Sequence, residues 1–252
     1  MKKLTTLLTG LMLISAATQA QDIVVTSPQL KNIILEEYTG INCPYCPYGH
    51  QEAEAIYDDY PTRTAIINVH TGYYSQPSEG QPDFRTDWGA ALASEASVAG
   101  YPAGSVNRHY FPDIADGSGS AMGRDKWASA AAIIKDEPSY MNVGFESQYN
   151  SSTREVTVNV EVYYVEDAPF MVDNNYINIA VTENQVYGYQ ANGGDNYEHN
   201  HILRDLITGQ WGDEIASPEA GDLIERSYTY TLPSEYDASN CDITVFVAEG
   251  HS

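Results

Sequence analysis

Two cysteines separated by two residues are the feature of this sequence with the clearest chemistry. Cys43 and Cys46 enclose Pro44 and Tyr45, and a helical pattern follows them. At a helix N-terminus, unpaired backbone N–H groups and the helix dipole stabilise a thiolate relative to a thiol. Cys43 lies where this effect acts, and Cys46 lies about one helical turn further on, close enough to displace a mixed disulfide. The spacing predicts thiol–disulfide exchange, with an exposed Cys43 thiolate as the nucleophile and Cys46 as the resolving thiol.

Two other roles for the cysteine pair remain open on the residues alone. One is a zinc site, which needs two more Cys or His ligands at short spacing; the nearest candidates are His50 and His70. The other is a permanent structural disulfide. We favour exchange because the pair stands between a strand pattern and a helix pattern. Pro44 also suits a first helical turn, where its missing N–H would be unpaired in any case.

The elements that must position the pair are a strand before it and a helix after it. Residues 33–38 form an apolar strand pattern, helical spacing continues to Pro61, and residues 64–70 predict a second, buried strand. Strand, helix and strand in this order form the unit of a parallel sheet. Further patterns predict helices at 83–96 and 124–135 and a strand at 103–108, up to a boundary at Glu137 and Pro138.

The second half of the chain has a different pattern. Short runs of alternating apolar and polar residues predict half-buried antiparallel strands at 141–149, 155–163, 176–186, 226–232 and 241–248. Clusters of Asn, Gly, Asp and Pro separate these runs. The pattern favours an all-β, immunoglobulin-like sandwich domain over residues 138–252, behind an α/β domain over residues 21–137.

The first residues indicate export. Lys2 and Lys3 precede an apolar run over residues 4–17 and a stretch of small residues that ends at Ala20. This is typical of a cleavable signal peptide over residues 1–20, and we expect the mature protein to lie in the periplasm, at the outer membrane or at the cell surface. The run is too short for a permanent transmembrane helix, and no second long apolar stretch follows.

The charge of the chain excludes one class of partner. Removing residues 1–20 takes away two basic and no acidic residues, which changes the formal net charge from −23 to −25. Nucleic acid is excluded as a natural partner, because phosphate binding needs a basic surface. The acidity itself favours solubility in an external or salty medium over a specific cation site.

Strand, Cys-Pro-Tyr-Cys, helix and strand, followed by Tyr101 and Pro102 after a glycine, resemble the thioredoxin superfamily. The resemblance implies that Pro102 is cis and faces the cysteine pair, and that the Tyr101 backbone pairs with an extended substrate beside the sulfurs. It also implies that Glu37 is a buried carboxylate that relays the proton of the resolving cysteine. Glu36 points to the opposite face of the strand, and the pattern leaves open which of the two faces inward.

The dipeptide Pro44-Tyr45 is similar to that of glutaredoxins, and we expect both residues to lie at the substrate and to tune thiolate stability. We do not carry over glutathione as a substrate, because an exported acidic chain has no obvious glutathione site. The expected partners are protein thiols and disulfides. No cofactor is expected, and the sequence indicates no oligomeric state.

A closer resemblance covers most of the mature chain. Glu36-Glu37-Tyr38-Thr39-Gly40 leading into Cys43 to Pro47, together with His199-Asn200-His201-Ile202-Leu203-Arg204 and Trp211-Gly212, resembles the twenty-eight-kilodalton outer-membrane protein family of Bacteroidetes-type bacteria. That family implies a thioredoxin-like domain coupled to a β-sandwich, and a surface adhesin or receptor role. The alternative function is therefore a surface-binding protein whose cysteine pair is a permanent disulfide and whose tyrosine-rich sandwich contacts an external ligand.

Three further features carry weaker signals. His199 and His201 would share one side of a strand, but no third ligand is placed by spacing, so no metal is expected. The acidic loops at 113–116 and 195–198 lack the spacing of a calcium loop. Cys241 opens an apolar strand and is expected to be a buried small hydrophobe.

Overall fold

The computed structural model describes residues 23–169 and 174–250, so the predicted signal peptide lies outside the described residues. Strand β1 (Ile33–Thr39) pairs in parallel with β2 (Thr64–His70), and the two are connected by helix α1 (Cys46–Asp59). On its other side β1 pairs antiparallel with β3 (Ala103–Val106), which pairs with the short β4 (Met122–Gly123). The resulting order β2-β1-β3-β4 is consistent with the thioredoxin resemblance.

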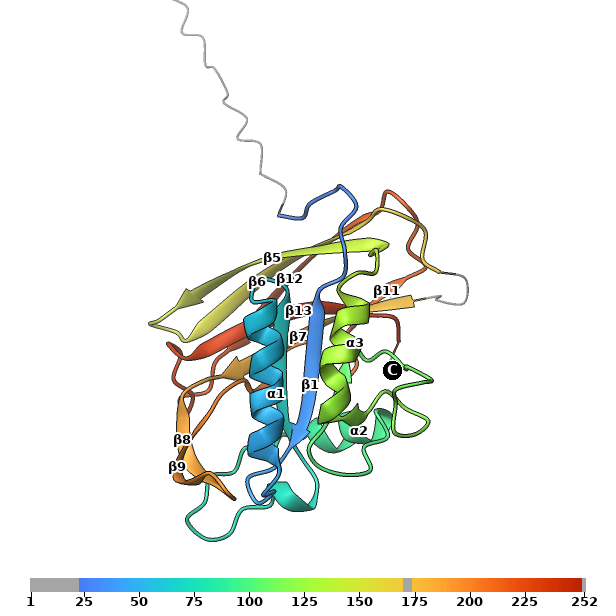
Figure 1. The fold of residues 1–252 in the computed structure, drawn as a ribbon. Helices are drawn as coiled ribbons and strands as arrows, with labels where there is room; N and C mark the ends of the chain where they lie inside the picture. Colours follow the sequence, from blue (N-terminus) through green and yellow to red (C-terminus); the bar gives the residue numbers. More distant parts are fainter. Residues whose placement is uncertain (1–22, 170–173, 251–252) are drawn as a thin grey trace, which may run out of the picture.

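Helices cover both faces of these strands. Helices α1 and α3 (Trp127–Ile134) lie on one face, as Figure 1 shows, and enclose a core that contains Leu35, Ile56 and Trp127. Helix α2 (Gly89–Glu95) packs on the other face. It is shorter than the predicted helix at 83–96, because residues 83–88 remain outside it and Arg85 instead forms an isolated bridge with His70. Two 3₁₀ turns, η1 (Tyr73–Ser75) and η2 (Arg124–Lys126), complete this half.

Both neighbouring glutamates of β1 are buried, one on each face, because β1 is a central strand with packed layers on both sides. Glu37 is fully buried and faces α1. Glu36 is 2% exposed and accepts two hydrogen bonds from Arg108, at 2.7 and 2.9 Å. A buried carboxylate needs such a partner, since an unpaired charge in the interior is costly.

The strands of the second half extend the same sheet. Strand β7 (Asn174–Glu183) pairs antiparallel with β10 (Ile202–Leu206), β11 (Asp213–Ala216) and β13 (Cys241–Ala248). Strand β10 in turn pairs in parallel with β2, where Ile202 lies opposite Asn68. One eight-stranded sheet therefore runs through both halves of the chain.

A three-stranded antiparallel sheet of β5 (Met141–Asn150), β6 (Glu155–Tyr164) and β12 (Leu223–Thr231) forms a further layer. Alternate valines of β6 pack against Ile177, Ile179 and Ile215 from the large sheet. The fold is thus mixed α/β, and the apolar faces of the second half do form two packed layers. The expected sandwich shares one of its layers with the first half, and the division at residues 137 and 138 stays a prediction.

A hairpin of β8 (Val186–Gln190) and β9 (Gly194–His199) stands apart from both sheets. In Figure 1 it lies beside the end of α1 at which the cysteine pair is found. The residue pattern did not predict this hairpin as a separate element.

Candidate functional site

The two cysteines lie at the start of α1, as predicted, but the helix begins later than the pattern indicated. Cys46 is the first helical residue, and Pro47, not Pro44, occupies the first turn. The backbone N–H of Cys46 donates to the Cys43 carbonyl at 3.3 Å. Both cysteines are free thiols in this structure.

The environments of the two thiols differ strongly. A hydrogen bond from the Cys46 thiol, with backbone N–H groups of Tyr45 and Cys46 and the charge of Arg124, lowers the pKa of Cys43 to about 7. Burial, followed by the hydrogen bond to Cys43, raises the pKa of Cys46. Near neutral pH the pair therefore holds one proton, on Cys46, and Cys43 carries much of the thiolate.

Cys43 is less accessible than the sequence suggested. We expected an exposed thiolate at position 43, but Cys43 is 1% exposed and Cys46 is fully buried. The exposed residues of this loop are Pro44 and Tyr45, with Tyr45 at 60%. Pro44 and Tyr45, rather than the two sulfurs, therefore form the surface of this loop.

The Tyr101–Pro102 bond is cis, as the resemblance implied, and Pro102 lies against α1. The contact is at Gly49, where an added Cβ would stand 2.9 Å from the Pro102 side chain and 2.5 Å from Oε1 of Glu37. Position 49 must therefore be glycine for Pro102, Glu37 and the helix to approach one another this closely. The sequence reading had assigned no role to Gly49.

Tyr101 packs toward the loop after β2. Its hydroxyl lies against the backbone of Gly72, and its ring is 6.1 Å from the ring of Tyr74. Tyr74 contacts Tyr73, which is 80% exposed. An aromatic surface thus borders the loop that carries Pro102.

Glu37 has an unusual environment for a carboxylate. Neither of its oxygens has a hydrogen-bond partner among the described side chains, and Nε2 of His50 is 3.7 Å from Oε1. Burial, then the nearby charges of Cys43 and Glu54, raise the pKa of Glu37 well above its ordinary value. The protonated form is therefore favoured.

A series of neighbouring polar side chains starts at Cys46. The hydroxyl of Thr39 hydrogen-bonds to the Cys46 sulfur and lies 3.0 Å from Nε2 of His50. Nδ1 of the same ring lies 2.9 Å from the hydroxyl of Tyr197, on β9. The local cause is spacing: Thr39 and Glu37 share one face of β1, and Cys46 and His50 are four residues apart on α1.

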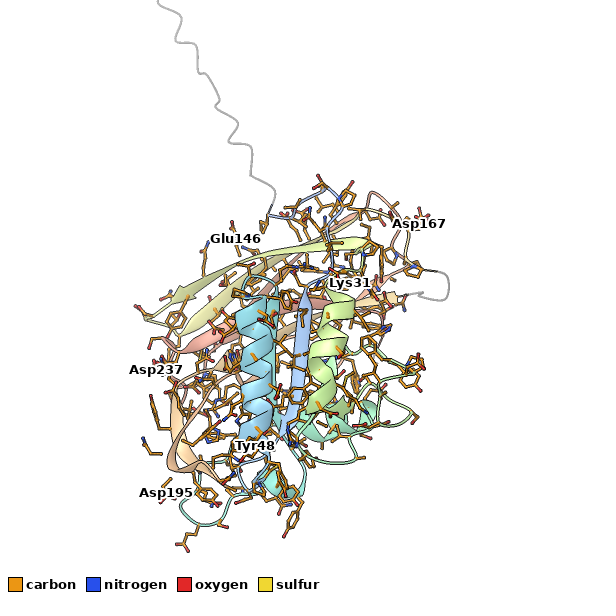
Figure 2. The ribbon with its side chains drawn as sticks, viewed as in Figure 1. Lys31, Tyr48, Glu146, Asp167, Asp195 and Asp237 are labelled. Carbon is orange, nitrogen blue, oxygen red and sulfur yellow. The ribbon has the colours of Figure 1, made fainter. Side chains whose placement is uncertain are left out.

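The β8–β9 hairpin is hydrogen-bonded to the cysteine loop. The buried side chain of Gln190 donates to the carbonyls of Cys43 at 3.0 Å and Gly40 at 3.3 Å. The backbone N–H of Ala191 donates to the Ile41 carbonyl at 2.7 Å. Figure 2 shows Tyr48 on α1 and Asp195 on the hairpin at this end of the molecule.

The predicted histidine pair does not act as a unit. His199 is buried among Phe84, His70 and Tyr197, with ring centroids 4.7, 5.8 and 4.9 Å away. His201 instead faces α1, where its Nε2 lies 3.2 Å from Oε1 of Glu54. Within residues 23–169 and 174–250, no group of three or more His, Cys, Asp or Glu side chains has the arrangement of a metal site.

The residues that sequence reasoning missed are Thr39, Gly49, Arg124, Gln190 and Tyr197, and His50 was considered only as a zinc ligand. The spacings of Thr39 from Glu37 and of His50 from Cys46 were available signals. Gln190 and Tyr197 had none, because only folding brings them to residues about 150 positions earlier in the chain.

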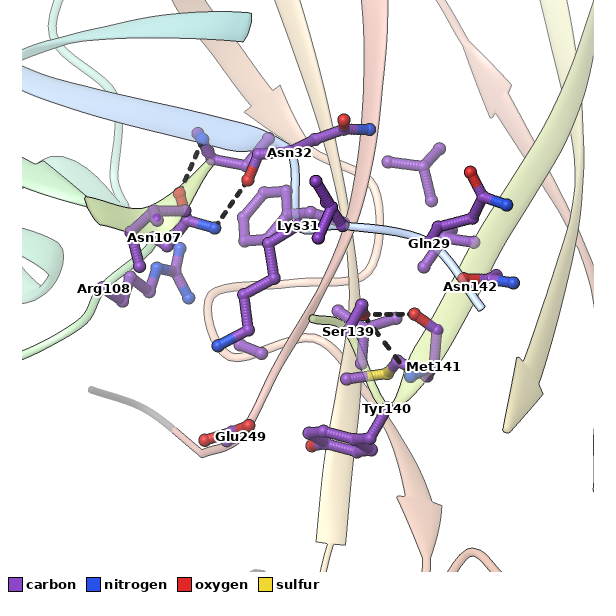
Figure 3. Close-up of a pocket in the computed structure, with 18 of the residues that line it drawn as sticks. Gln29, Lys31, Asn32, Asn107, Arg108, Ser139, Tyr140, Met141, Asn142 and Glu249 are labelled. Carbon is purple, nitrogen blue, oxygen red and sulfur yellow. Dashed lines mark hydrogen bonds between the residues drawn. The ribbon is translucent and has the colours of Figure 1, made fainter. Parts of the chain in front are cut away.

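A cavity of about 850 Å³ lies away from the cysteine pair. It is enclosed by the segment before β1, by β5 and by the end of β13, and Figure 3 shows the Lys31 side chain extending into it. None of the site residues described above lines it. The geometry at the cysteines, and not the size of this cavity, identifies the place where thiol chemistry can occur.

The described part of the chain has no helix with the length and apolar character needed to cross a membrane. Comparison with curated proteins finds no match. Among solved structures, HBP35 of Porphyromonas gingivalis is similar at 22% identity and a TM-score of 0.70, covering 89% of this chain and 73% of that chain. A protein from Agrobacterium tumefaciens is similar at 8% identity and a TM-score of 0.51, and the similarity covers 81% of this chain and 80% of that chain. These two similarities concern the fold.

A third structure, a domain of the outer membrane lipoprotein Omp28 from Porphyromonas gingivalis, covers 45% of this chain and 84% of that domain at 20% identity and a TM-score of 0.30. The family model described as outer membrane protein Omp28 matches residues 90–252, well over half of the chain. The matched region holds Pro102 and the β8–β9 hairpin but begins after the cysteine pair. The chain therefore belongs to the outer membrane protein Omp28 family and is an exported protein associated with the outer membrane.

Proposed function

We propose that this protein is an exported thiol–disulfide oxidoreductase that acts on protein substrates through Cys43 and Cys46, on a thioredoxin-like half of the chain. The observation that carries the proposal is the asymmetry of the pair. Cys43, with a pKa of about 7, receives backbone N–H donors at the start of α1, whereas Cys46 is held as a thiol. A permanent structural disulfide needs no such difference between its sulfurs.

In the proposed reaction, the Cys43 thiolate attacks a substrate disulfide, and one substrate sulfur leaves as a thiolate. Cys46 then loses its proton and attacks the Cys43 sulfur, which releases the second substrate thiolate and forms the Cys43–Cys46 disulfide. The substrate gains two electrons and the protein loses them. The reverse sequence oxidises a substrate dithiol, and the pair would serve either direction.

The surroundings supply a surface for a polypeptide substrate. Cis-Pro102 leaves the Tyr101 backbone beside the site, where an extended polypeptide would pair with it. The exposed residues Pro44 and Tyr45 directly follow Cys43 in the chain. Aromatic side chains offer large contact area with few rotatable bonds, which suits contact with varied polypeptides.

The decisive experiment traps the mixed disulfide. In the Cys46→Ala protein, expressed in its own cell envelope, partners should stay covalently attached to Cys43 and appear as reducible bands on a non-reducing gel. The Cys43→Ala/Cys46→Ala protein should trap nothing. Cys241→Ala is the matched control, because burial raises the pKa of Cys241 to about 11 and the residue lies on β13.

A surface-binding function is the second candidate, favoured by the cavity that Lys31 enters. In that function the cysteine pair would be a stable disulfide. Failure of the Cys46→Ala protein to capture any partner would end the oxidoreductase proposal and leave binding as the better account.

A further inference from the structure

Cys46 is the thiol whose deprotonation is hardest in this site, and the structure holds a hydrogen-bonded path from its sulfur to the β8–β9 hairpin. We propose that Thr39, His50 and Tyr197 form the route by which the proton of Cys46 leaves when this residue resolves a mixed disulfide. The inference deepens the proposed oxidoreductase function and rests on it. It assigns proton transfer to residues other than Glu37, to which the thioredoxin resemblance gives that role.

Two of the contacts on this path have hydrogen-bond lengths, and the third joins the Thr39 hydroxyl to the Cys46 sulfur. The Thr39 hydroxyl bonds to the Cys46 sulfur and lies 3.0 Å from Nε2 of His50, and Nδ1 of His50 lies 2.9 Å from the Tyr197 hydroxyl. Glu37, in contrast, has neither oxygen in a hydrogen bond among the described side chains. Nε2 of His50 lies 3.7 Å from Oε1 of Glu37, beyond hydrogen-bond length.

The proton balance closes without a charged intermediate. In the mixed disulfide the Cys43 sulfur is no longer a thiolate, and the Cys46 S–H donates to Thr39, the Thr39 hydroxyl to Nε2 of His50, and Nδ1–H to Tyr197. As Cys46 attacks, its proton passes to the Thr39 oxygen, the Thr39 proton to Nε2, the Nδ1 proton to the Tyr197 oxygen, and the Tyr197 proton to solvent. After this transfer every hydrogen-bond donor of the path points toward the Cys46 sulfur, so the path stabilises the attacking thiolate. Cys46 loses one proton and solvent gains it.

Three features suit these residues to this task. Burial, then the neighbouring His199 and His201, lower the pKa of His50 to about 3, so the ring is neutral and has one nitrogen free to accept. Burial, then the charges of Glu37 and Glu54, raise the pKa of Tyr197 to about 12, which keeps its hydroxyl protonated. Tyr197 is partly exposed, whereas Cys46 and Thr39 are fully buried.

The titratable groups around His50 come from three directions. Glu37 faces it from β1, Glu54 lies further along α1, and Tyr197 and His199 approach from β9, with His201 just beyond. Thr39→Val leaves all of these groups in place, and Tyr197→Phe removes only a hydroxyl that is uncharged at neutral pH. Thr39→Val and Tyr197→Phe are therefore the sharpest tests.

The test follows the release of thionitrobenzoate from 5,5′-dithiobis(2-nitrobenzoate) in stopped flow, with every protein in a Cys241→Ala background. Attack by Cys43 releases a first equivalent, and attack by Cys46 on the resulting mixed disulfide releases a second. Thr39→Val and Tyr197→Phe should keep the first phase and slow the second by about a hundredfold at neutral pH, the lower end of typical general-base contributions. The pH profile of the second phase should move to higher pH, and Thr39→Ser should restore it.

The outcomes separate the two proposals. An unchanged second phase in both hydroxyl-deletion variants overturns the proton path while leaving the exchange function intact. If Thr39→Val or Tyr197→Phe also lost the first phase, the substitution would have disturbed the structure of the site. If Thr39→Ser failed to recover the second phase, the proton path would be rejected. Cys46→Ala should release one equivalent of thionitrobenzoate and no second. If the protein with native Cys46, Thr39 and Tyr197 also releases no second equivalent, the proposed oxidoreductase function fails, and the proton path fails with it.

Discussion

The start of helix α1 gives two identical side chains, those of Cys43 and Cys46, different reactivities. Cys43 accepts hydrogen bonds from two backbone N–H groups and from the Cys46 thiol, whereas burial dominates the environment of Cys46. Cys43 should therefore react with iodoacetamide along a pH profile with a midpoint near 7.

At neutral pH the reaction of Cys43 should be roughly tenfold or more faster than that of Cys241, whose pKa burial raises to about 11. Cys46 should remain unlabelled during brief exposure. Peptide mapping by mass spectrometry after timed alkylation gives all three rates in one sample. Preferential labelling of Cys46 would sink the assignment of Cys43 as nucleophile.

Between elements, the important contact joins the β8–β9 hairpin to the cysteine loop. Gln190 is fully buried and is the hydrogen-bond donor to the carbonyls of Cys43 and Gly40. Gln190→Ala leaves these carbonyls without that donor, so the free energy of unfolding should fall by about 1–3 kcal/mol. Backbone amide exchange over residues 40–46 and alkylation of Cys43 should both become faster.

The matched control for this contact is Asn192→Gly, because the backbone of Asn192 has a φ of 64°, which glycine adopts without strain. Asn192 is exposed, and its bonds to Pro44 and Tyr48 are long, at 3.3 and 3.5 Å. Urea unfolding and hydrogen-exchange mass spectrometry measure both variants. Equal behaviour of the two would mean that the hairpin does not hold the cysteine loop.

At the scale of the whole molecule, buried neutral histidines link stability to pH. Burial lowers the pKa of His199 to about 4, below its ordinary value of 6.5. Between these values the unfolded chain binds more protons than the folded one, so stability falls as pH decreases through this window. For His199 the loss between pH 7 and pH 5 is about 2 kcal/mol.

His199→Phe should therefore remove about 2 kcal/mol of the pH dependence in urea unfolding at pH 7 and pH 5. The raised pKa of Glu37 acts with the opposite sign, since its folded form keeps a proton that the unfolded chain releases as pH rises. That contribution is common to both proteins and cancels in the comparison. His109→Phe, at an exposed position, is the control and should retain the full pH dependence.

Local patterns sufficed for the elements nearest the cysteines. The strand at 64–70 was predicted with the observed bounds, the strand before the pair ended one residue short, and the cis bond before Pro102 followed from the resemblance. These features depend on periodicity, on turn residues and on a short motif, all of which are local in sequence. The alternating runs of the second half likewise corresponded to β5, β6, β12 and β13.

What the sequence by itself determined is therefore the cysteine pair, its helix and the strands whose side chains alternate. Tertiary structure alone decided that β10 extends the sheet from β2, that Glu37 and Glu36 are both buried, and that Gln190 and Tyr197 meet the cysteine loop and His50. The physical reason is that burial and hydrogen-bond partners depend on which distant surfaces pack together. Spacing along the chain places a side chain on a face of its own element, but the element packed against that face sets its charge and its reactivity.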